Sequence, residues 1–310
     1  MKEKIKASVL ASFAADTLAL GLHWIYNTHV IDRKYGRVES LLKPELAKYH
    51  AGREKGDFTH YGDQTRVLLD TIKETSGFDL DAYFLNWQAL FKDYDGYLDH
   101  ATKETLENIA RGKSSHEAGS SSDDLSGASR IAPLLLCRHA DREKLVEDAR
   151  AQTAMTHNNP LVVDAAGFFA GVLHRVVHGS TPEEALKDAL RQLNPDSHFV
   201  AAVKKGLASK DLETREAILD FGQMCSFEGA LPSTIHLIVN YQNDLKSALV
   251  ENIMAGGDSA ARGLIAGMIL GAHNGMEAIP VSWLSEMNQF TAIEKIIDEM
   301  LSLKTTSFEA

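Results

Sequence analysis

Two short acidic segments, far apart in the sequence, contain the residue types that could do chemistry. Gly62-Asp63-Gln64-Thr65 and Gly256-Gly257-Asp258-Ser259 each place one carboxylate just before an apolar stretch with helical spacing. Folding could bring the two helix starts together, so that the carboxylates of Asp63 and Asp258 face one another across a polar cleft and hold a cation. The alternative is that each aspartate is a helix N-cap, which accepts hydrogen bonds from backbone N–H groups.

Two further carboxylates lie on apolar stripes. Asp16 follows Val9 and Phe13 on one stripe, and Asp164 lies close before Phe168 on another. An unpaired carboxylate in the core would cost several kcal/mol, so a buried aspartate must have a partner. We expect both side chains to point inward, where either could position a water molecule. The alternatives are a structural partner for Asp16, such as a helix end or an arginine, and a helix-packing hydrogen bond for Asp164.

Helical spacing of apolar residues recurs along most of the chain and predicts the elements that must position these residues. No series of alternating strand-like segments joined by hairpin turns is present. We therefore expect an all-α protein. Its helices are predicted at residues 4–22, 64–75, 79–94, 99–111, 141–155, 161–178, 181–193, 197–208, 213–225, 231–241, 244–254, 259–273 and 289–303.

Length and composition predict one large globular domain. The chain has 310 residues, of which 44% are hydrophobic and 24% charged, and no Pro/Gly/Ser-rich linker divides it. We expect a single domain over residues 1–310, with residues 304–310 loose. The oligomeric state does not follow from the sequence.

Charge and cysteine content narrow the partners and the compartment. A net charge of -11 argues against nucleic acid or an anionic membrane as the main partner and favours a small-molecule ligand. Cys137 and Cys225 are too few for a disulfide framework, so we expect a cytoplasmic protein in which both are core thiols. No apolar run reaches the roughly 18 residues that a membrane span needs.

Other common chemistries lack their motifs. The sequence contains no Gly-x-Ser-x-Gly elbow, no His-Glu-x-x-His, no phosphate-binding P-loop and no dinucleotide fingerprint after a strand. Serine hydrolysis of that type, zinc proteolysis of that type and nucleotide binding of those types therefore fit the sequence poorly.

Several polar and aromatic residues have the properties of ligand contacts. Aromatic rings provide rigid stacking area, serine hydroxyls and backbone N–H groups suit a polar ligand, an arginine binds phosphate, and a histidine before Pro160 sits at a helix break. Each also has a plainer explanation: core packing, a solvated loop, a buried ion pair or a turn histidine. The candidates are His23, Trp24, Tyr26, Ser120, Ser121, Ser122, Arg130, His157 and Asn158.

Taken in order, these segments resemble the ADP-ribosylglycohydrolase family, in the branch that includes jellyfish lens crystallins of the J class. No single motif is specific, but their shared order covers the chain from about residue 7 to about residue 283. The segments are Ala15-Asp16-Thr17-Leu18, Leu22-His23-Trp24-Ile25-Tyr26, Gly62-Asp63-Gln64-Thr65, the loop from Ser120 to Leu125, Gly127-Ala128-Ser129-Arg130, Thr156-His157-Asn158-Asn159-Pro160, and Gly256-Gly257-Asp258-Ser259 before Gly267-Met268-Ile269-Leu270-Gly271.

The resemblance implies an orthogonal bundle of helices with a central acidic cleft, in which two Mg²⁺ or Mn²⁺ ions lie beside an ADP-ribose pocket. The family's acidic motifs usually read Thr-Asp-Asp-Thr and Gly-Gly-Asp-Thr-Asp-Thr. Here Asp63, Thr65 and Asp258 match, whereas Gln64, Ala260 and Ala261 replace other oxygen ligands, as Gly62 replaces a threonine. Because Mg²⁺ retains waters, the surviving ligands would hold one ion weakly, or none.

The predicted function is hydrolysis of a glycosidic bond in an ADP-ribose-like or ribosyl compound. The cation would be held by Asp63, Thr65 and Asp258, with Asp16, Asp63 and Asp164 as the catalytic carboxylates. The alternative is a non-catalytic descendant of the family, either a ligand-binding or a crystallin-like structural protein. Convergence of the inward aspartates on one cleft would favour hydrolysis, and their separation would favour the alternative.

Overall fold

The computed structural model describes residues 1–303, and these contain helices and turns but no β-strand. The prediction of an all-α protein is therefore confirmed. Extended backbone pairs only in two isolated bridges within this range, Ser120 with His157 and Asp124 with Ser226. Residues 304–310, predicted to be loose, lie outside the described residues.

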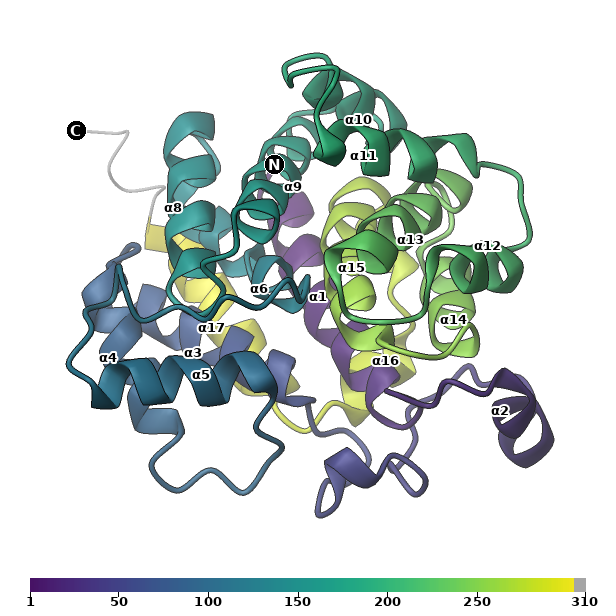
Figure 1. Cartoon of the computed structure of the whole chain (residues 1–310), viewed down its shortest axis with the longest axis horizontal. Helices are drawn as coiled ribbons and strands as arrows, with labels where there is room; N and C mark the ends of the chain where they lie inside the picture. The colour runs from purple at the N-terminus through teal and green to yellow at the C-terminus, as the bar shows by residue number, and fades with distance from the viewer. Residues whose placement is uncertain (304–310) are drawn as a thin grey trace.

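The helices follow the periodic segments of the sequence. Each predicted range overlaps a helix, although α4 and α12 end several residues earlier than predicted. Figure 1 shows their arrangement. In chain order they are α1 (Lys2–Leu20), α2 (Thr28–Tyr35), η1 (Lys48–His50), α3 (His60–Thr75), α4 (Leu80–Leu90), α5 (His100–Ala110), α6 (Ser126–Ser129), η2 (Ala132–Leu134), α7 (Leu135–Arg138), α8 (Arg142–Ala154), α9 (Pro160–Val177), α10 (Pro182–Leu190), α11 (His198–Ala208), α12 (Thr214–Phe221), α13 (Phe227–Asn240), α14 (Leu245–Met254), α15 (Ser259–Asn274), η3 (Met276–Ala278), α16 (Val281–Glu286) and α17 (Phe290–Leu303).

Helices α1 and α15 pack closely at the centre of the molecule (Figure 1). A Cβ atom on Gly267 would lie 2.7 Å from the Ala11 carbonyl oxygen, and one on Gly271 would lie 2.5 Å from the Ala11 Cβ. Glycine therefore permits the backbones to approach. The Ser8 hydroxyl donates to the Met268 carbonyl at 2.8 Å, which adds a hydrogen bond between the two helices.

The two central helices run antiparallel, because Ala7 of α1 lies against Gly271 while Ala15 lies against Gly263 and Gly267. This direction places the end of α1, which carries Asp16, at the same end of the pair as Asp258 before α15. Packing of small residues thus brings two of the predicted acidic residues into one region.

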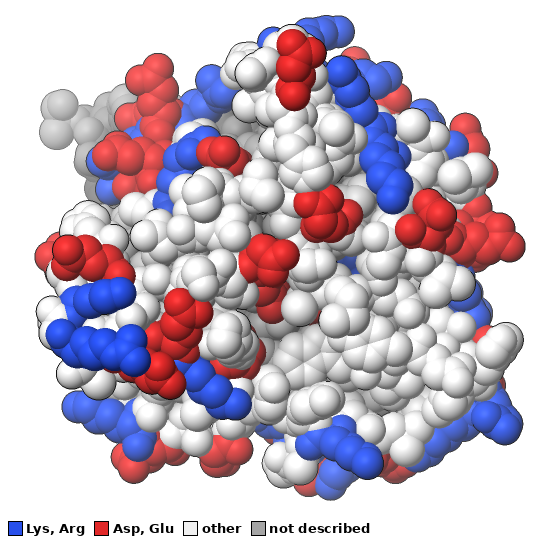
Figure 2. All heavy atoms as spheres, viewed as in Figure 1, with Lys and Arg blue, Asp and Glu red and all other residues white. Residues whose placement is uncertain are grey.

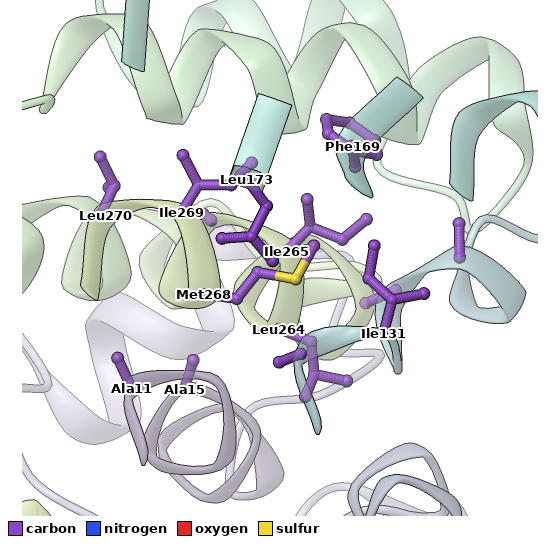
Figure 3. Packing of buried hydrophobic residues seen from close by; sticks show 14 of the residues in the cluster. Ala11, Ala15, Ile131, Phe169, Leu173, Leu264, Ile265, Met268, Ile269 and Leu270 are labelled. Atoms are coloured by element: carbon purple, nitrogen blue, oxygen red, sulfur yellow. The ribbon is translucent and has the colours of Figure 1, made fainter. Parts of the chain in front are cut away.

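The other side of α15 presents large apolar side chains. Figure 3 shows Ile265, Met268 and Ile269 of α15 directed toward Phe169 and Leu173 of α9. All of these residues are fully buried in the core. Small residues on one face and large ones on the other hold α15 between α1 and α9.

Helix α9 has the length and apolar composition of a membrane span. This differs from the sequence prediction that no segment does. However, 67% of the helix is buried inside the protein. This burial is typical of a core helix. On the face drawn in Figure 2, acidic and basic side chains are interspersed rather than gathered into one basic patch.

Candidate functional site

Asp258 lies in a tight turn before α15. Gly256 and Gly257 have φ angles of +71° and +69°, which glycine adopts readily. The buried guanidinium of Arg262 donates to the Gly256 carbonyl and to Asn252 Oδ1, at 2.5 and 3.0 Å. The turn therefore fixes the aspartate with little freedom.

The Asp258 carboxylate is an N-cap and also has a histidine partner. Its Oδ1 accepts from the Ala261 N–H at 3.2 Å and lies 2.9 Å from His23 Nε2. His23 Nδ1 lies 2.7 Å from His50 Nε2, so the network assigns a relay in which His50 donates to His23 and His23 donates to Asp258. Asp258 is therefore an N-cap, as the alternative predicted. Its hydrogen bonds to the helix and to His23 involve only Oδ1.

Burial and the histidine act against each other on the pKa of Asp258. Burial alone would raise this pKa, but the hydrogen bond from His23, the positive charge nearby, including that of Arg262, and the Ala261 N–H together outweigh it, so the pKa is lowered. Burial lowers the pKa of His23 more than Asp258 raises it. A neutral histidine thus orients an ionised carboxylate.

Asp124 and Cys225 complete a cluster with Asp258, in which one ligand atom from each residue lies within 4.8 Å of the others. Oδ2 of Asp258 is buried and has no hydrogen-bond partner. Burial, followed by the charge of Asp258, raises the pKa of Asp124. Burial and the charges of both aspartates also raise the pKa of the Cys225 thiol. Burial and mutual repulsion therefore disfavour the charged forms of Asp124 and Cys225.

Asp63 has a different environment from Asp258. Its Oδ2 lies 2.6 Å from Arg53 Nη2 and accepts from the Tyr94 hydroxyl at 2.6 Å. Burial raises its pKa, opposed by the charge of Arg53. The guanidinium supplies the positive charge that the sequence hypothesis assigned to a metal ion.

Unlike Asp258, Asp63 is not the N-cap of its helix. Thr59 is the N-cap of α3, and its hydroxyl accepts a hydrogen bond from the Tyr61 N–H. Thr65, predicted as a ligand, donates its hydroxyl to the Tyr61 carbonyl at 2.8 Å. Among residues 1–303, Asp63 belongs to no group of three or more His, Cys, Asp or Glu side chains that could hold a metal ion, and it shares no hydrogen-bond partner with Asp258.

Asp16 is fully buried, as predicted. Its Oδ2 accepts from the Thr59 N–H at 2.8 Å and its Oδ1 from the Thr59 hydroxyl at 2.6 Å. Burial raises its pKa to about 7, and these two bonds oppose the shift. A Cβ atom at Gly62 would lie 2.2 Å from Asp16 Oδ2, so the glycine of the first acidic segment makes room for this carboxyl.

Asp164 differs from the prediction of an inward carboxylate. Its side chain is 49% exposed and lies 2.7 Å from Arg150 Nη1. It lines a surface pocket between α8 and α9 to which Asp16, Asp63 and Asp258 do not contribute. The apolar stripe on α9 indicates burial for the helix face, but Asp164 lies at its edge beside an arginine.

The predicted aromatic residues border the histidine relay. The ring of Trp24 stacks on His23 with centroids 4.3 Å apart and meets Tyr97 edge-on at 5.1 Å. Trp24 adopts a φ of +65°, an uncommon conformation for a non-glycine residue. Tyr26 is 40% exposed, and the charge of Asp258 helps to raise its pKa, so this residue lies where the cluster approaches the surface.

Arg130 is buried and donates its hydrogen bonds to neutral groups rather than to an aspartate. Its guanidinium donates to Gln64 Oε1 and to the Thr156 hydroxyl. Gln64 Oε1 also accepts from Trp87 Nε1 at 2.8 Å. The glutamine that replaces a family carboxylate thus has a structural role. His157 Nδ1 lies 2.9 Å from the same Thr156 hydroxyl, and burial lowers the pKa of His157 to about 3.

The serine loop and Asn158 are tied together by backbone hydrogen bonds. Ser120 is buried, and its N–H and hydroxyl both bond to the Thr156 carbonyl, while the Asn158 N–H donates to the Ser120 carbonyl at 2.7 Å. Ser121 is exposed and Ser122 half-buried. These contacts place the loop next to Asp124 in the chain, but they occupy the polar groups of Ser120 internally.

The donor set fits a divalent cation at Asp124, Cys225 and Asp258 better than at Asp63. Two carboxylates and a thiol suit ions such as Zn²⁺ or Mn²⁺, and an unpartnered buried oxygen gives such an ion a ready ligand. Sequence reasoning missed Arg53, which compensates Asp63, and assigned Cys225 to the core. The available signal was Asp124, inside the polar loop already singled out for ligand contact.

Comparison with known proteins agrees with this architecture. A model of the ADP-ribosylglycohydrolase family matches residues 1–309. Crystallin J1A of Tripedalia cystophora is 26% identical over 96% of both chains. The ADP-ribosyl-[dinitrogen reductase] glycohydrolase of Rhodospirillum rubrum is 25% identical over 57% of this chain and 55% of its own.

A solved structure described as an ADP-ribosylglycohydrolase-related protein complex superposes with a TM-score of 0.70 at 19% identity, covering 97% of this chain and 98% of the other. At that identity the likeness shows the shared fold alone. Together with the match of the family model over almost the full length, it shows that the chain belongs to the ADP-ribosylglycohydrolase family.

Proposed function

We propose that this protein hydrolyses the glycosidic bond of an ADP-ribose-like or ribosyl compound with the help of one divalent cation held by Asp124, Cys225 and Asp258. The observation that carries the proposal is the unpartnered Oδ2 of Asp258 beside Asp124 and Cys225. A buried carboxylate oxygen without a donor is costly, and a cation would compensate it.

The surrounding residues fit this role. A bound divalent cation would supply Lewis acidity and orient ribose hydroxyls. The His50–His23 relay orients the Asp258 carboxylate, as outer hydrogen bonds commonly do for metal ligands. Tyr26, half exposed near the cluster, offers a ring against which a ribose or base would pack.

A non-catalytic function is the second candidate, and one specific observation favours it. Arg53 and Tyr94 both occupy Asp63 Oδ2, so an aspartate that matches the family's first acidic motif is compensated without a cation. The similarity to Crystallin J1A over 96% of both chains agrees with a ligand-binding or structural descendant.

Turnover measurements on two matched aspartate variants separate these functions. The assay follows release of ADP-ribose or ribose from a panel of ADP-ribosylated and ribosyl substrates with Mg²⁺, Mn²⁺ or Zn²⁺. Asp258→Asn retains a good helix cap but loses the charge, so turnover should fall about 10²-fold or more, which is roughly 2.7 kcal/mol of transition-state stabilisation. Asp63→Asn should change turnover by less than about tenfold, because this side chain faces Arg53.

The wild-type protein provides the decisive control. If it turns over no member of the panel with any of the three ions but still binds ADP-ribose, the non-catalytic function holds. If turnover survives both Asp258→Asn and a chelator, catalysis does not use this cation site. If Asp63→Asn has the larger effect, the original assignment of the cation to Asp63 is correct.

A further inference from the structure

A cavity that no residue of the acidic cluster lines lies between α8, α9 and the chain leading into α11. Its volume is about 430 Å³, within the range of small-molecule sites. Asp16, Asp63, Asp124, Cys225 and Asp258 do not line it. Whatever it binds is therefore separate from the proposed hydrolase site.

Part of the cavity wall is apolar. Val146 of α8, Leu161 and Phe168 of α9, and Phe199 of α11 contribute to it. The Phe168 and Phe199 rings pack edge to face with centroids 5.5 Å apart, so this wall is firm. Such a surface suits an apolar or aromatic body rather than a fully polar ligand.

Two arginines lie at this part of the cavity: Arg142 lines it, and Arg175 lies beside the lining residue Gly171. Arg142 and Arg175 form no ion pair with any carboxylate among residues 1–303. Arg142 Nη2 donates to Gln192 Oε1 at 2.8 Å, and its Nε is buried without a partner. Arg175 Nη1 donates to the Gly171 carbonyl at 2.9 Å. Two guanidinium groups thus have neutral acceptors only.

Both guanidinium groups reach the same small space. A Cβ atom on Gly171 would lie 3.5 Å from Arg175 Nη1 and 3.7 Å from Arg142 Nη2. Gly171 lines the cavity, so the absent side chain leaves that space open. Burial and, after it, the charge of Arg142 lower the pKa of Arg175, although the charge of Asp188 opposes this shift.

Two acidic residues near the cavity are paired with other arginines. Asp164 pairs with Arg150 at 2.7 Å, and Asp188 pairs with Arg191 at 2.5 Å. In a protein of net charge -11, two neighbouring guanidinium groups that form no ion pair with a carboxylate offer favourable contacts for an anion.

We propose that this cavity binds a small molecule that has one compact anionic group, a phosphate or a carboxylate, on an apolar body. The anion lies between Arg142 and Arg175 near Gly171, and the apolar body lies against Phe168 and Phe199. These four residues determine which class of ligand binds. Binding at this cavity does not depend on hydrolysis at the acidic cluster.

Calorimetric titration with simple probes tests the proposal on the intact protein. Phenyl phosphate and benzoate present the two anions on an aromatic body, inorganic phosphate lacks the body, and benzyl alcohol lacks the charge. We expect one site for phenyl phosphate or benzoate, with binding at least tenfold tighter than for the other two probes. Whichever of the two aromatic anions binds more tightly shows whether the site prefers a phosphate or a carboxylate.

Matched variants locate the binding. Arg142→Gln and Arg175→Gln should each weaken the preferred probe about tenfold or more, and Arg142→Lys should weaken it less. Arg111→Gln, which removes an exposed arginine paired with Glu107, is the charge control and should leave binding unchanged. Asp258→Asn should also leave it unchanged, and circular-dichroism melts confirm that each variant folds.

Several outcomes would overturn the proposal. They are no binding of either aromatic anion at millimolar concentration, equal affinity for inorganic phosphate, unchanged affinity in both arginine variants, or loss of binding in Asp258→Asn. The last result would place the probe in the acidic cluster. Hydrolase activity, present or absent, has no bearing on any of these measurements.

Discussion

At the scale of single residues, two aspartates that look alike in sequence have different environments. Asp258 has one oxygen held by His23 and its helix and the other unpartnered, whereas Asp63 is held by Arg53 and Tyr94. Their positions at the starts of helices were predictable from local sequence, although Asp63 lies within the first turn of α3 rather than before it. Their partners were not, because each partner arrives through tertiary packing of distant segments.

The raised pKa of Asp16 predicts how the stability of the protein depends on pH. Its pKa is raised to about 7 in the folded protein, chiefly by burial, against about 3.9 in an unfolded chain. The protonated form is thus the one that the fold favours. Its stabilising contribution is complete below about pH 4 and is lost progressively as pH rises toward and through 7.

Asp16→Asn should remove this dependence, since asparagine imitates the neutral carboxyl beside Thr59. Between pH 5 and 7 the free energy of unfolding of the wild type should fall relative to that of the variant by about 1 kcal/mol per pH unit, and above pH 8 the difference should be constant. Urea denaturation across this range measures it. A difference independent of pH would show that Asp16 is ionised throughout.

At the scale of elements, the long helices were predictable because their periodic apolar residues extend over several turns. The short helices α2, α6, α7 and α16 were not predicted, because one or two turns do not establish a period. The glycines of α15 carried a further signal. Gly263, Gly267 and Gly271 repeat at every fourth position, a spacing that places them on one helix face.

Two glycine-to-alanine variants separate helix propensity from close packing. Gly271→Ala would push a methyl group to within 2.6 Å of the Ala7 carbonyl on α1, so we expect a loss of about 1–3 kcal/mol in stability. Gly171→Ala in α9 meets only ordinary contacts at 3.5 Å or more and should gain about 0.5–1 kcal/mol.

Chemical denaturation of the two variants beside the wild type gives both changes. Both variants make the same substitution but at sites that differ in packing. Changes of opposite sign in the free energy of unfolding would therefore isolate the effect of the close contact between α1 and α15. A gain in both variants would mean that the central helices can separate slightly without cost.

At the scale of the whole molecule, the packing of α1 against α15 decides which acidic groups meet. The antiparallel pair brings Asp16 and Asp258 to one end, and the loop before α6 and the turn before α13 bring Asp124 and Cys225 to Asp258. The family was predictable from the order of motifs, and the all-α fold from the helical spacing of apolar residues. The composition of the cluster was not, because Asp124, Cys225 and Asp258 come from three distant segments with no shared spacing.

Cation binding at this cluster should appear as a change in global stability. An ion that binds the folded protein and not the unfolded chain stabilises it by about 2.7 kcal/mol at a concentration one hundred times its Kd. For a chain of this size, each kcal/mol of stabilisation raises Tm by about 2–4 °C or less. Thermal melts with Zn²⁺, Mn²⁺ or Mg²⁺ should therefore show a rise for at least one ion.

The variants identify the ligands that produce the rise. Asp258→Asn should abolish it for every ion, because the bare oxygen and its charge belong to that residue. Cys225→Ser should reduce the effect of Zn²⁺ more than that of Mn²⁺ or Mg²⁺, since the thiol is the soft ligand of the set. Asp63→Asn should leave it unchanged, because Arg53 already compensates that carboxylate. A rise that survives Asp258→Asn but disappears in Asp63→Asn would return the cation to the first acidic segment and refute the cluster as its site.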